Sequence, residues 1–97
     1  MHIALPHKGT KDAAKQQVQT MLAEGRSKFG DQVQLHEDRW EDDTLHFDLT
    51  AQGQRISGTL RVEDSQFVLD AKLPLMLRLF EGRIEREVAE QVKKLQQ

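Results

Sequence analysis

Histidine and acidic side chains are the residues of this chain whose types could support metal binding or acid–base catalysis. The histidines are His2, His7, His36 and His46, and no two of them show the close helical or hairpin spacing from which metal sites are built. His46 and Asp48 share one face of a predicted strand, but no third ligand accompanies them. We therefore expect solvated histidines on the surface and no metal site.

Other kinds of catalytic or ligand-binding motif are also missing from the sequence. The acidic segment from Glu37 to Asp43 lacks the D-x-[DN]-x-[DN]-G pattern of a calcium loop, so we interpret it as a solvated turn. Ser57 lies in mid-strand and no G-x-S-x-G turn is present, which argues against a serine nucleophile. The scattered glycines form neither a Walker loop nor a dinucleotide fingerprint. We therefore expect a non-enzymatic protein with no catalytic residues and no cofactor.

The length and composition of the chain indicate the number of domains, the kinds of partner and the location of the protein. Its 97 residues suffice for one domain with one core, so we expect a single domain over residues 1–97. The formal net charge of -2 gives no drive toward nucleic acid, and the absence of cysteine excludes disulfides and thiolate metal sites. No segment resembles a secretion signal or a membrane span of ~20 apolar residues. These features predict a cytoplasmic location.

The spacing of apolar residues predicts a strand and a helix in the first third of the chain. His2 to Leu5 is a short apolar run that ends at Pro6, and we interpret it as a strand. Thr10 can cap the helix that follows, and Gly30 predicts a left-handed stop for it. The apolar residues of this helix recur at spacings of three and four, at Ala14, Val18, Met21, Leu22, Gly25 and Phe29.

Alternation of apolar and polar residues after Gly30 predicts four strands joined by short turns. The apolar positions run from Val33 to Leu35, Leu45 to Leu49, Ile56 to Val62 and Phe67 to Leu73. Short connections rich in turn formers indicate hairpins, and hence an antiparallel meander. Because the alternation is clean, one face of the sheet is expected to be buried and the other polar. We expect Trp40, at a strand end, to close one end of the core.

A final helix completes the predicted fold. Pro74 suits its first turn, and an apolar stripe then runs from Leu77 to Leu95. Each helix has one apolar face and the sheet has one, so the simplest packing places both helices on the same side. The predicted fold is α+β, in the order β-α-β-β-β-β-α, with two helices packed on one face of an antiparallel meander sheet.

The start of this final helix carries more apolar residues than one helix face can hold. If Leu77 and Phe80 face the core, then Leu75, Met76 and Leu79 cannot all do so. Either the junction is buried between the last strand and the first helix, or these three residues form a contact patch. Such a patch would suit a partner, a second copy of the chain or a hydrophobic surface.

Residues along nearly the whole chain resemble one known family. The shared features begin with His7, Ala13, Ala14 and the Phe29-Gly30 helix end. They continue through Trp40, Asp43, Leu45-His46-Phe47, Gly53, Ile56-Ser57-Gly58-Thr59-Leu60, Leu73-Pro74-Leu75-Met76-Leu77 and Ile84. In order and spacing they are similar to the small polyhydroxyalkanoic acid system proteins, also described as granule-region proteins. The resemblance implies presence on or near bacterial polyhydroxyalkanoate granules, and it brings no catalytic residue set.

Two functions fit these observations best, and a third, that of an enzyme, would have only polar-face candidates such as His46, Asp48 and Arg61. The leading hypothesis is a non-enzymatic protein associated with polyhydroxyalkanoate granules or granule proteins. It would act through the surface residues Leu75, Met76 and Leu79, or through self-association as a homodimer.

The alternative is a carrier of a small hydrophobic ligand, with a helix-grip-like pocket between the sheet and the C-terminal helix. Glycine weakens a strand, so Gly58 on the inward face indicates a bulge, a close approach of a helix or room for a ligand. For a carrier, Gly58, Ala71 and Phe80 are the expected pocket-lining residues. A carrier requires a cavity of ~300 Å³ or more, whereas an interaction protein can be solidly packed.

Overall fold

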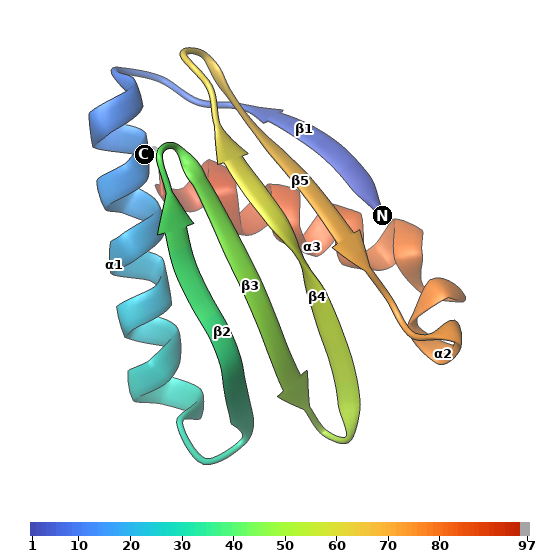
Figure 1. Cartoon of the computed structure of the whole chain (residues 1–97). Coiled ribbons are helices and arrows are strands. Elements are labelled where there is room, and N and C mark those ends of the chain that lie inside the picture. The colour runs from blue at the N-terminus through green and yellow to red at the C-terminus, as the bar shows by residue number, and fades with distance from the viewer. Residues whose placement is uncertain (96–97) are drawn as a thin grey trace.

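The computed structural model describes residues 1–95 and confirms the predicted α+β fold. Five strands and three helices follow one another along the chain (Figure 1). Their bounds are β1 His2–Pro6, α1 Lys11–Phe29, β2 Val33–Glu41, β3 Thr44–Ala51, β4 Gln54–Val62, β5 Gln66–Lys72, α2 Leu75–Arg78 and α3 Glu81–Leu95. None of the helices within residues 1–95 is long and apolar enough to span a membrane.

The strands form one antiparallel sheet in the order β1-β5-β4-β3-β2, so β2 to β5 are the predicted meander. The β3–β4 hairpin turns at Gln52 and Gly53, whose φ angles of 53° and 77° match the twist of the strands they join. A row of paired residues crosses all five strands on the buried face, comprising Trp40, Leu45, Leu60, Leu69 and Ile3. The period of two therefore places one apolar face under the helices, as predicted.

Both long helices cover the same face of the sheet, which confirms the predicted packing. In Figure 1, α1 runs alongside β2, and α3 crosses behind the sheet from α2 toward α1. The core between these layers consists of buried residues from the helix and the sheet, namely Ala14, Val18, Leu45, Val62 and Phe67. Trp40 packs against this cluster beneath the ammonium group of Lys15, 5.1 Å from the ring centroid, so it closes one end of the core.

Three local features differ from the sequence-based predictions. The final helix is broken into α2 and α3, because the chain turns at Leu79 before Ile84 N–H donates to the carbonyl of Phe80 at 2.9 Å. Gly30 has φ -41° and ψ -51°, so it ends α1 in a right-handed conformation and not a left-handed one. An added Cβ at Gly30 would lie 2.9 Å from the carbonyl oxygen of Arg26, so the tight helix end still requires glycine.

The third difference is an irregularity in β2 between Leu35 and Glu37, which shifts the register of the rest of the strand. Strict alternation from Leu35 would turn Glu37 toward the helices. The bulge turns Asp38 toward them instead, opposite Phe47 of β3. A carboxylate thereby enters the apolar layer, where it becomes part of the candidate site.

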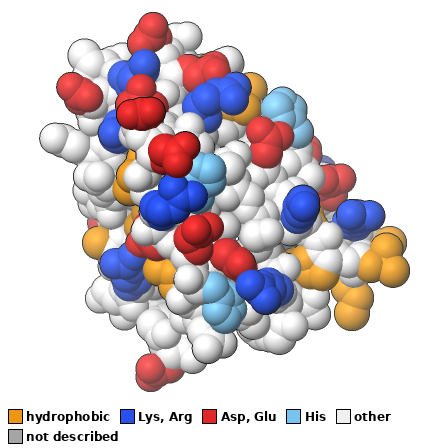
Figure 2. All heavy atoms as spheres, viewed as in Figure 1, with side chains coloured by type: hydrophobic (Ala, Val, Ile, Leu, Met, Phe, Trp, Pro, Cys, Tyr) orange, Lys and Arg blue, Asp and Glu red, His pale blue; other side chains and the backbone are white. Residues whose placement is uncertain are grey.

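The outer face of the sheet is charged and largely self-neutralised. Figure 2 shows acidic and basic side chains interspersed over the strands, with hydrophobic side chains gathered at the right-hand edge where Figure 1 places α2. Arg55 binds Asp48 through two hydrogen bonds of 3.0 and 2.8 Å, and Arg39 contacts Glu37 and Glu41. This face suits contact with water and offers no aromatic platform for stacking bases.

Candidate functional site

The short helix α2 presents a group of exposed apolar side chains. Its turn is closed by N–H groups of Leu77 and Arg78, which donate to the carbonyl of Pro74 at 2.9 and 3.1 Å. Leu77 is half-buried and fixes the turn to the body of the protein. The neighbouring side chains point to solvent, with exposed fractions of 76% for Leu75, 66% for Met76, 79% for Leu79 and 54% for Phe80. We call these four residues the α2 patch.

The structure therefore brings together the three residues that the sequence singled out at this junction. Leu75, Met76 and Leu79 lie on one exposed turn, and Leu73 beside them is buried. Phe80, between α2 and α3, is also exposed, whereas the sequence pattern places it in the stripe that faces the core. A natural surface rarely concentrates four large apolar side chains in so short a segment, so this patch is a candidate contact site.

A second candidate site is an apolar cavity between the sheet, α1 and α3. Its volume is about 360 Å³, and aliphatic or aromatic side chains from the sheet, α1 and α3 make up nearly all of its wall. We call it the apolar cavity, and its lining is Leu5, Val18, Met21, Leu22, Leu35, Asp38, Leu45, Phe47, Leu49, Leu60, Phe67, Leu69, Val88, Val92 and Leu95.

Among the residues that the structure describes, Asp38 is the one charged residue that lines the apolar cavity. The bulge in β2 turns its carboxylate toward the helices, and Arg26 of α1 binds it in an ion pair. Arg26 reaches outward and is mostly exposed, so the pair stands at an edge of the cavity. Sequence reasoning missed both residues, because alternation alone assigns Asp38 to the polar face.

The residues expected to line a carrier's pocket lie elsewhere. Gly58 and Ala71 line a polar hollow on the outer face, together with His2, Asp70 and neighbouring residues. An added Cβ at Gly58 would lie 2.0 Å from the carbonyl oxygen of Asp70, so the glycine permits close approach of β4 and β5. Neither of them, nor Phe80, lines the apolar cavity among residues 1–95.

The histidines are distributed over separate contacts. His2 binds Asp70, and His36 binds the hydroxyl of Thr50 at 2.8 Å. Within residues 1–95, no three histidine, aspartate or glutamate side chains lie close enough together to hold a metal ion. His7 is buried against the ring of Phe67, with 4.9 Å between the ring centroids, and its Nε2 donates to the carbonyl of Glu63 at 2.6 Å. The prediction of a solvated surface histidine is therefore wrong for His7, whose contacts support the loop before α1.

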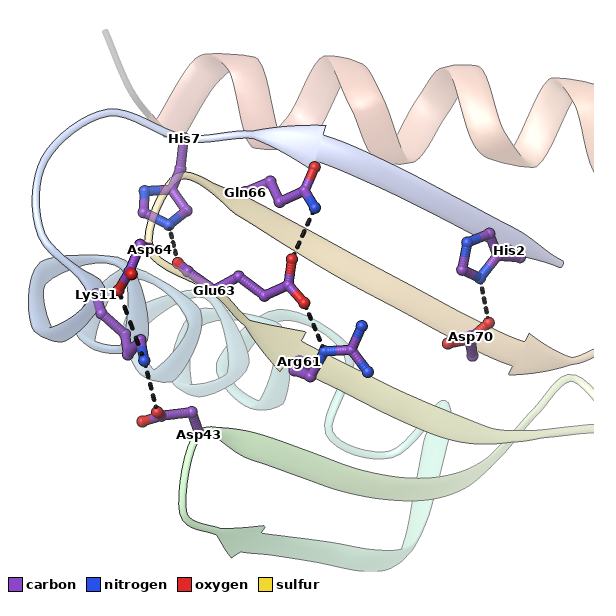
Figure 3. Close-up of polar contacts among 9 residues, drawn as sticks. All are labelled: His2, His7, Lys11, Asp43, Arg61, Glu63, Asp64, Gln66 and Asp70. Carbon is purple, nitrogen blue, oxygen red and sulfur yellow. Dashed lines mark hydrogen bonds and ion pairs between the residues drawn. The ribbon is translucent and has the colours of Figure 1, made fainter.

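Glu63 links His7 to a polar network at one end of the sheet (Figure 3). Gln66 Nε2 and Arg61 Nε donate to its two carboxylate oxygens at 2.7 and 2.8 Å. The hydrogen bond from Gln66, followed by that from Arg61, holds the pKa of Glu63 below its usual range.

Lys11 binds a second pair of carboxylates in the same region, at 3.1 Å from Asp43 and 3.6 Å from Asp64 (Figure 3). The hydrogen bond from Lys11 lowers the pKa of Asp43. Both Glu63 and Asp43 are therefore ionised at neutral pH. They suit ion pairing, which in the case of Lys11 joins α1 to the β2–β3 and β4–β5 turns, and not proton transfer.

Comparison with protein families identifies a match over nearly the whole chain. Residues 1–95 match a family model described as "Putative polyhydroxyalkanoic acid system protein". The match covers all the elements described above, including the α2 patch and the lining of the apolar cavity. Searches of curated proteins and of solved structures find no match.

Proposed function

The chain belongs to the polyhydroxyalkanoic acid system family, and we propose that it is a non-enzymatic protein that attaches to polyhydroxyalkanoate storage granules through the α2 patch. The family supports an association with polyhydroxyalkanoate, and the exposure of the α2 patch supports this way of achieving it. A polyester granule presents a hydrophobic surface to the surrounding water. Four adjacent apolar side chains on an otherwise charged body are suited to bind such a surface.

The size of the patch implies reversible attachment. Transfer of one exposed Leu, Met or Phe side chain out of water contributes about 1.5–3 kcal/mol when its burial is complete. Contact with a flat surface buries only part of each side chain, so the four together contribute several kcal/mol. A single myristoyl chain on a membrane likewise gives only marginal and reversible binding. The charged outer face of the sheet remains in water throughout (Figure 2).

Co-sedimentation of the purified protein with polyhydroxyalkanoate granules tests this proposal. In the test variant Leu75, Met76 and Leu79 are all replaced by Gln, which keeps good helix propensity and removes the apolar contacts. We expect the wild type to sediment with the granules and the variant to stay in solution. Phe29→Gln is the matched control, because Phe29 is a half-exposed aromatic residue at the end of α1, outside the α2 patch. Equal sedimentation of the wild type and the triple variant would exclude the α2 patch as the attachment site.

Self-association is the other use that the same patch could serve. Two copies that bury their patches against each other would form a homodimer, and would leave less apolar surface for a granule. Light scattering on the wild type and the triple Gln variant separates these uses. A wild-type dimer that the variant converts to a monomer would assign the patch to self-association.

The apolar cavity supports a second candidate function, that of a carrier for a small hydrophobic ligand. Its volume of about 360 Å³ exceeds the ~300 Å³ at which ligand sites begin. It lies between the sheet and the C-terminal helix α3, with α1 as its third wall. A carrier would use the cavity and leave the α2 patch for docking, so the two functions are compatible within one protein.

A further inference from the structure

The apolar cavity adjoins a smaller hollow at the C-terminal end of α1. This hollow, which we call the α1 hollow, has a volume of about 210 Å³. The two spaces have four lining residues in common, namely Met21, Leu22, Leu35 and Leu49. Asp38 lines the apolar cavity and Arg26 lines the α1 hollow. The ion pair between them therefore stands where the two spaces meet.

We propose that the apolar cavity binds one uncharged alkyl chain, as found in an alcohol or an ester, and that the Arg26–Asp38 pair excludes the carboxylate of the corresponding acid. The proposal rests on the carrier function. It names the ligand class of the cavity, and it identifies Asp38 as the residue that selects this class.

Side chains in the middle of the sheet show that the protein itself leaves this space unfilled. Phe47, Leu49, Leu60 and Leu69 lie on β3, β4 and β5, the three strands that have a neighbour on both sides. All four line the apolar cavity, yet all four are only half-buried. Positions beneath a well-packed helix layer are fully buried, because protein cores pack as densely as organic crystals. An apolar occupant would therefore gain contacts that folding has left unused.

The shape of the cavity suits a slender chain. Its wall comes from the sheet, α1 and α3, so the space is concave and a folded partner would cover only its opening. An engineered apolar cavity of about 150 Å³ takes up one benzene molecule. A cavity of about 360 Å³ therefore has room for an alkyl chain of about eight carbon atoms.

The charges at the cavity indicate that this chain carries no carboxylate. Asp38, the one charged residue of the lining within residues 1–95, is itself an acid. Arg26 already binds it, so a ligand carboxylate would have to displace Asp38 and leave that group unpaired in an apolar wall. A hydroxyl or ester group needs no cation. It can keep its hydrogen bonds to water at the edge where Arg26 is mostly exposed.

Methyl NMR of the wild type tests the position of the chain. Octanol and octanoate are the matched probes, because they have the same chain length and differ in charge. Saturable shifts with octanol are expected for Val18, Val88 and Val92, which line the cavity. Val68 is buried in β5 but is not part of the lining, so its methyl groups should stay unshifted. Unshifted methyl groups at all three lining valines would refute both the proposal and the carrier function.

Relative affinities test the ligand class. Hexanol should bind about fifteenfold more weakly than octanol, because each buried methylene group contributes about fourfold in affinity. Octanoate at neutral pH should bind about tenfold more weakly than octanol, because its carboxylate finds its cation already bound. Equal affinities for octanol and octanoate would leave the carrier function standing and overturn the selection by charge.

Asp38→Asn tests the residue that makes the selection. The variant removes the acid and releases the guanidinium group of Arg26 from it, so octanoate should bind about tenfold more tightly and octanol as before. Asp48→Asn is the matched control, because Asp48 forms a similar ion pair with Arg55 and lines neither space. Equal octanoate affinity in the two variants would overturn the role of Asp38.

A second copy of the chain is the competing occupant of this face. It would shift the same valine methyl groups as the protein concentration rises, with no alcohol present, and this result would overturn the proposal. The spectra are recorded on the triple Gln variant of the α2 patch, so that association through the α2 patch does not contribute. This variant should bind octanol as the wild type does, which separates failure of granule attachment from failure of ligand binding.

Discussion

Arg26 on α1 donates a hydrogen bond to the carboxylate of Asp38 on β2, and this pair joins the first helix to the edge strand of the sheet at the apolar cavity. Asp38 reaches this position because the bulge after Leu35 changes the face to which it points. A carboxylate in an apolar wall is costly unless a cation accompanies it. Arg26 supplies that cation from the helix and leaves its own outer side in water.

Replacement of Arg26 and replacement of Asp38 should have different effects on the free energy of unfolding. Arg26→Met leaves the carboxylate of Asp38 without a cation and should lower the free energy of unfolding by about 1 kcal/mol. Asp38→Leu removes the charge and extends the apolar wall, so it should leave stability unchanged or raise it slightly. Urea unfolding of both single variants and of the double variant measures these effects. An Asp38→Leu variant less stable than Arg26→Met would contradict this account of the pair.

Gly58 should tolerate no side chain. The Cβ of alanine at this position would lie 2.0 Å from the carbonyl oxygen of Asp70, and backbone atoms of β5 cannot move away without loss of strand pairing. We expect Gly58→Ala to lower the free energy of unfolding by about 3 kcal/mol. Gly82→Ala is the control, because the space around Gly82 in α3 is open and alanine favours a helix. Thermal unfolding should show a large decrease in Tm for the first variant and no decrease for the second.

The pairing of Asp48 with Arg55 should give the protein a measurable acid dependence. The hydrogen bonds from Arg55, aided by its charge, hold the pKa of Asp48 below the usual value of about 3.9. Since the folded-state pKa is lowered, this contribution to stability is complete above about pH 4 and is lost as the pH falls through the folded-state pKa. Arg55→Gln should therefore raise the pKa of Asp48 and lower stability at neutral pH, by an amount that disappears in acid.

NMR titration of the Asp48 carboxyl carbon, together with urea unfolding at about pH 7 and about pH 3, measures both effects. Arg83→Gln on α3 removes the same charge from an exposed position outside the sheet, and should leave the pKa of Asp48 unchanged. A stability difference between the wild type and Arg55→Gln that stays constant across this pH range would show that the pairing is not responsible.

The sequence predicts the periodic parts of this fold and misses the places where the period changes. Alternation after Gly30 is strong enough to place four strands and their buried face, because each apolar residue adds to the same two-residue pattern. One extra residue after Leu35 reverses the faces of the residues that follow, and no local signal marks it. The inward position of Asp38, and with it the charged group of the apolar cavity, therefore follows only from the three-dimensional structure.

The C-terminal region shows the same division between local and tertiary information. The apolar stripe from Ile84 to Leu95 predicts α3, but the break at Leu79 depends on where the chain must turn after β5. Excess apolar residues at this junction were sufficient to identify Leu75, Met76 and Leu79 as a candidate contact site. The apolar cavity depends on contacts between segments far apart in the sequence, so spacing could not reveal it.

The α2 patch should contribute little to folding, in contrast to the leucine that precedes it. Replacement of Leu75, Met76 and Leu79 by Gln removes side chains that are already in water, and should change the free energy of unfolding by no more than about 1 kcal/mol. Leu73→Ala, two residues before α2, removes a side chain that is only 6% exposed and should cost about 3 kcal/mol. Urea unfolding of the two variants compares them directly. A large loss of stability in the triple variant would mean that these residues support the fold, and the α2 patch would then no longer be available to bind a granule.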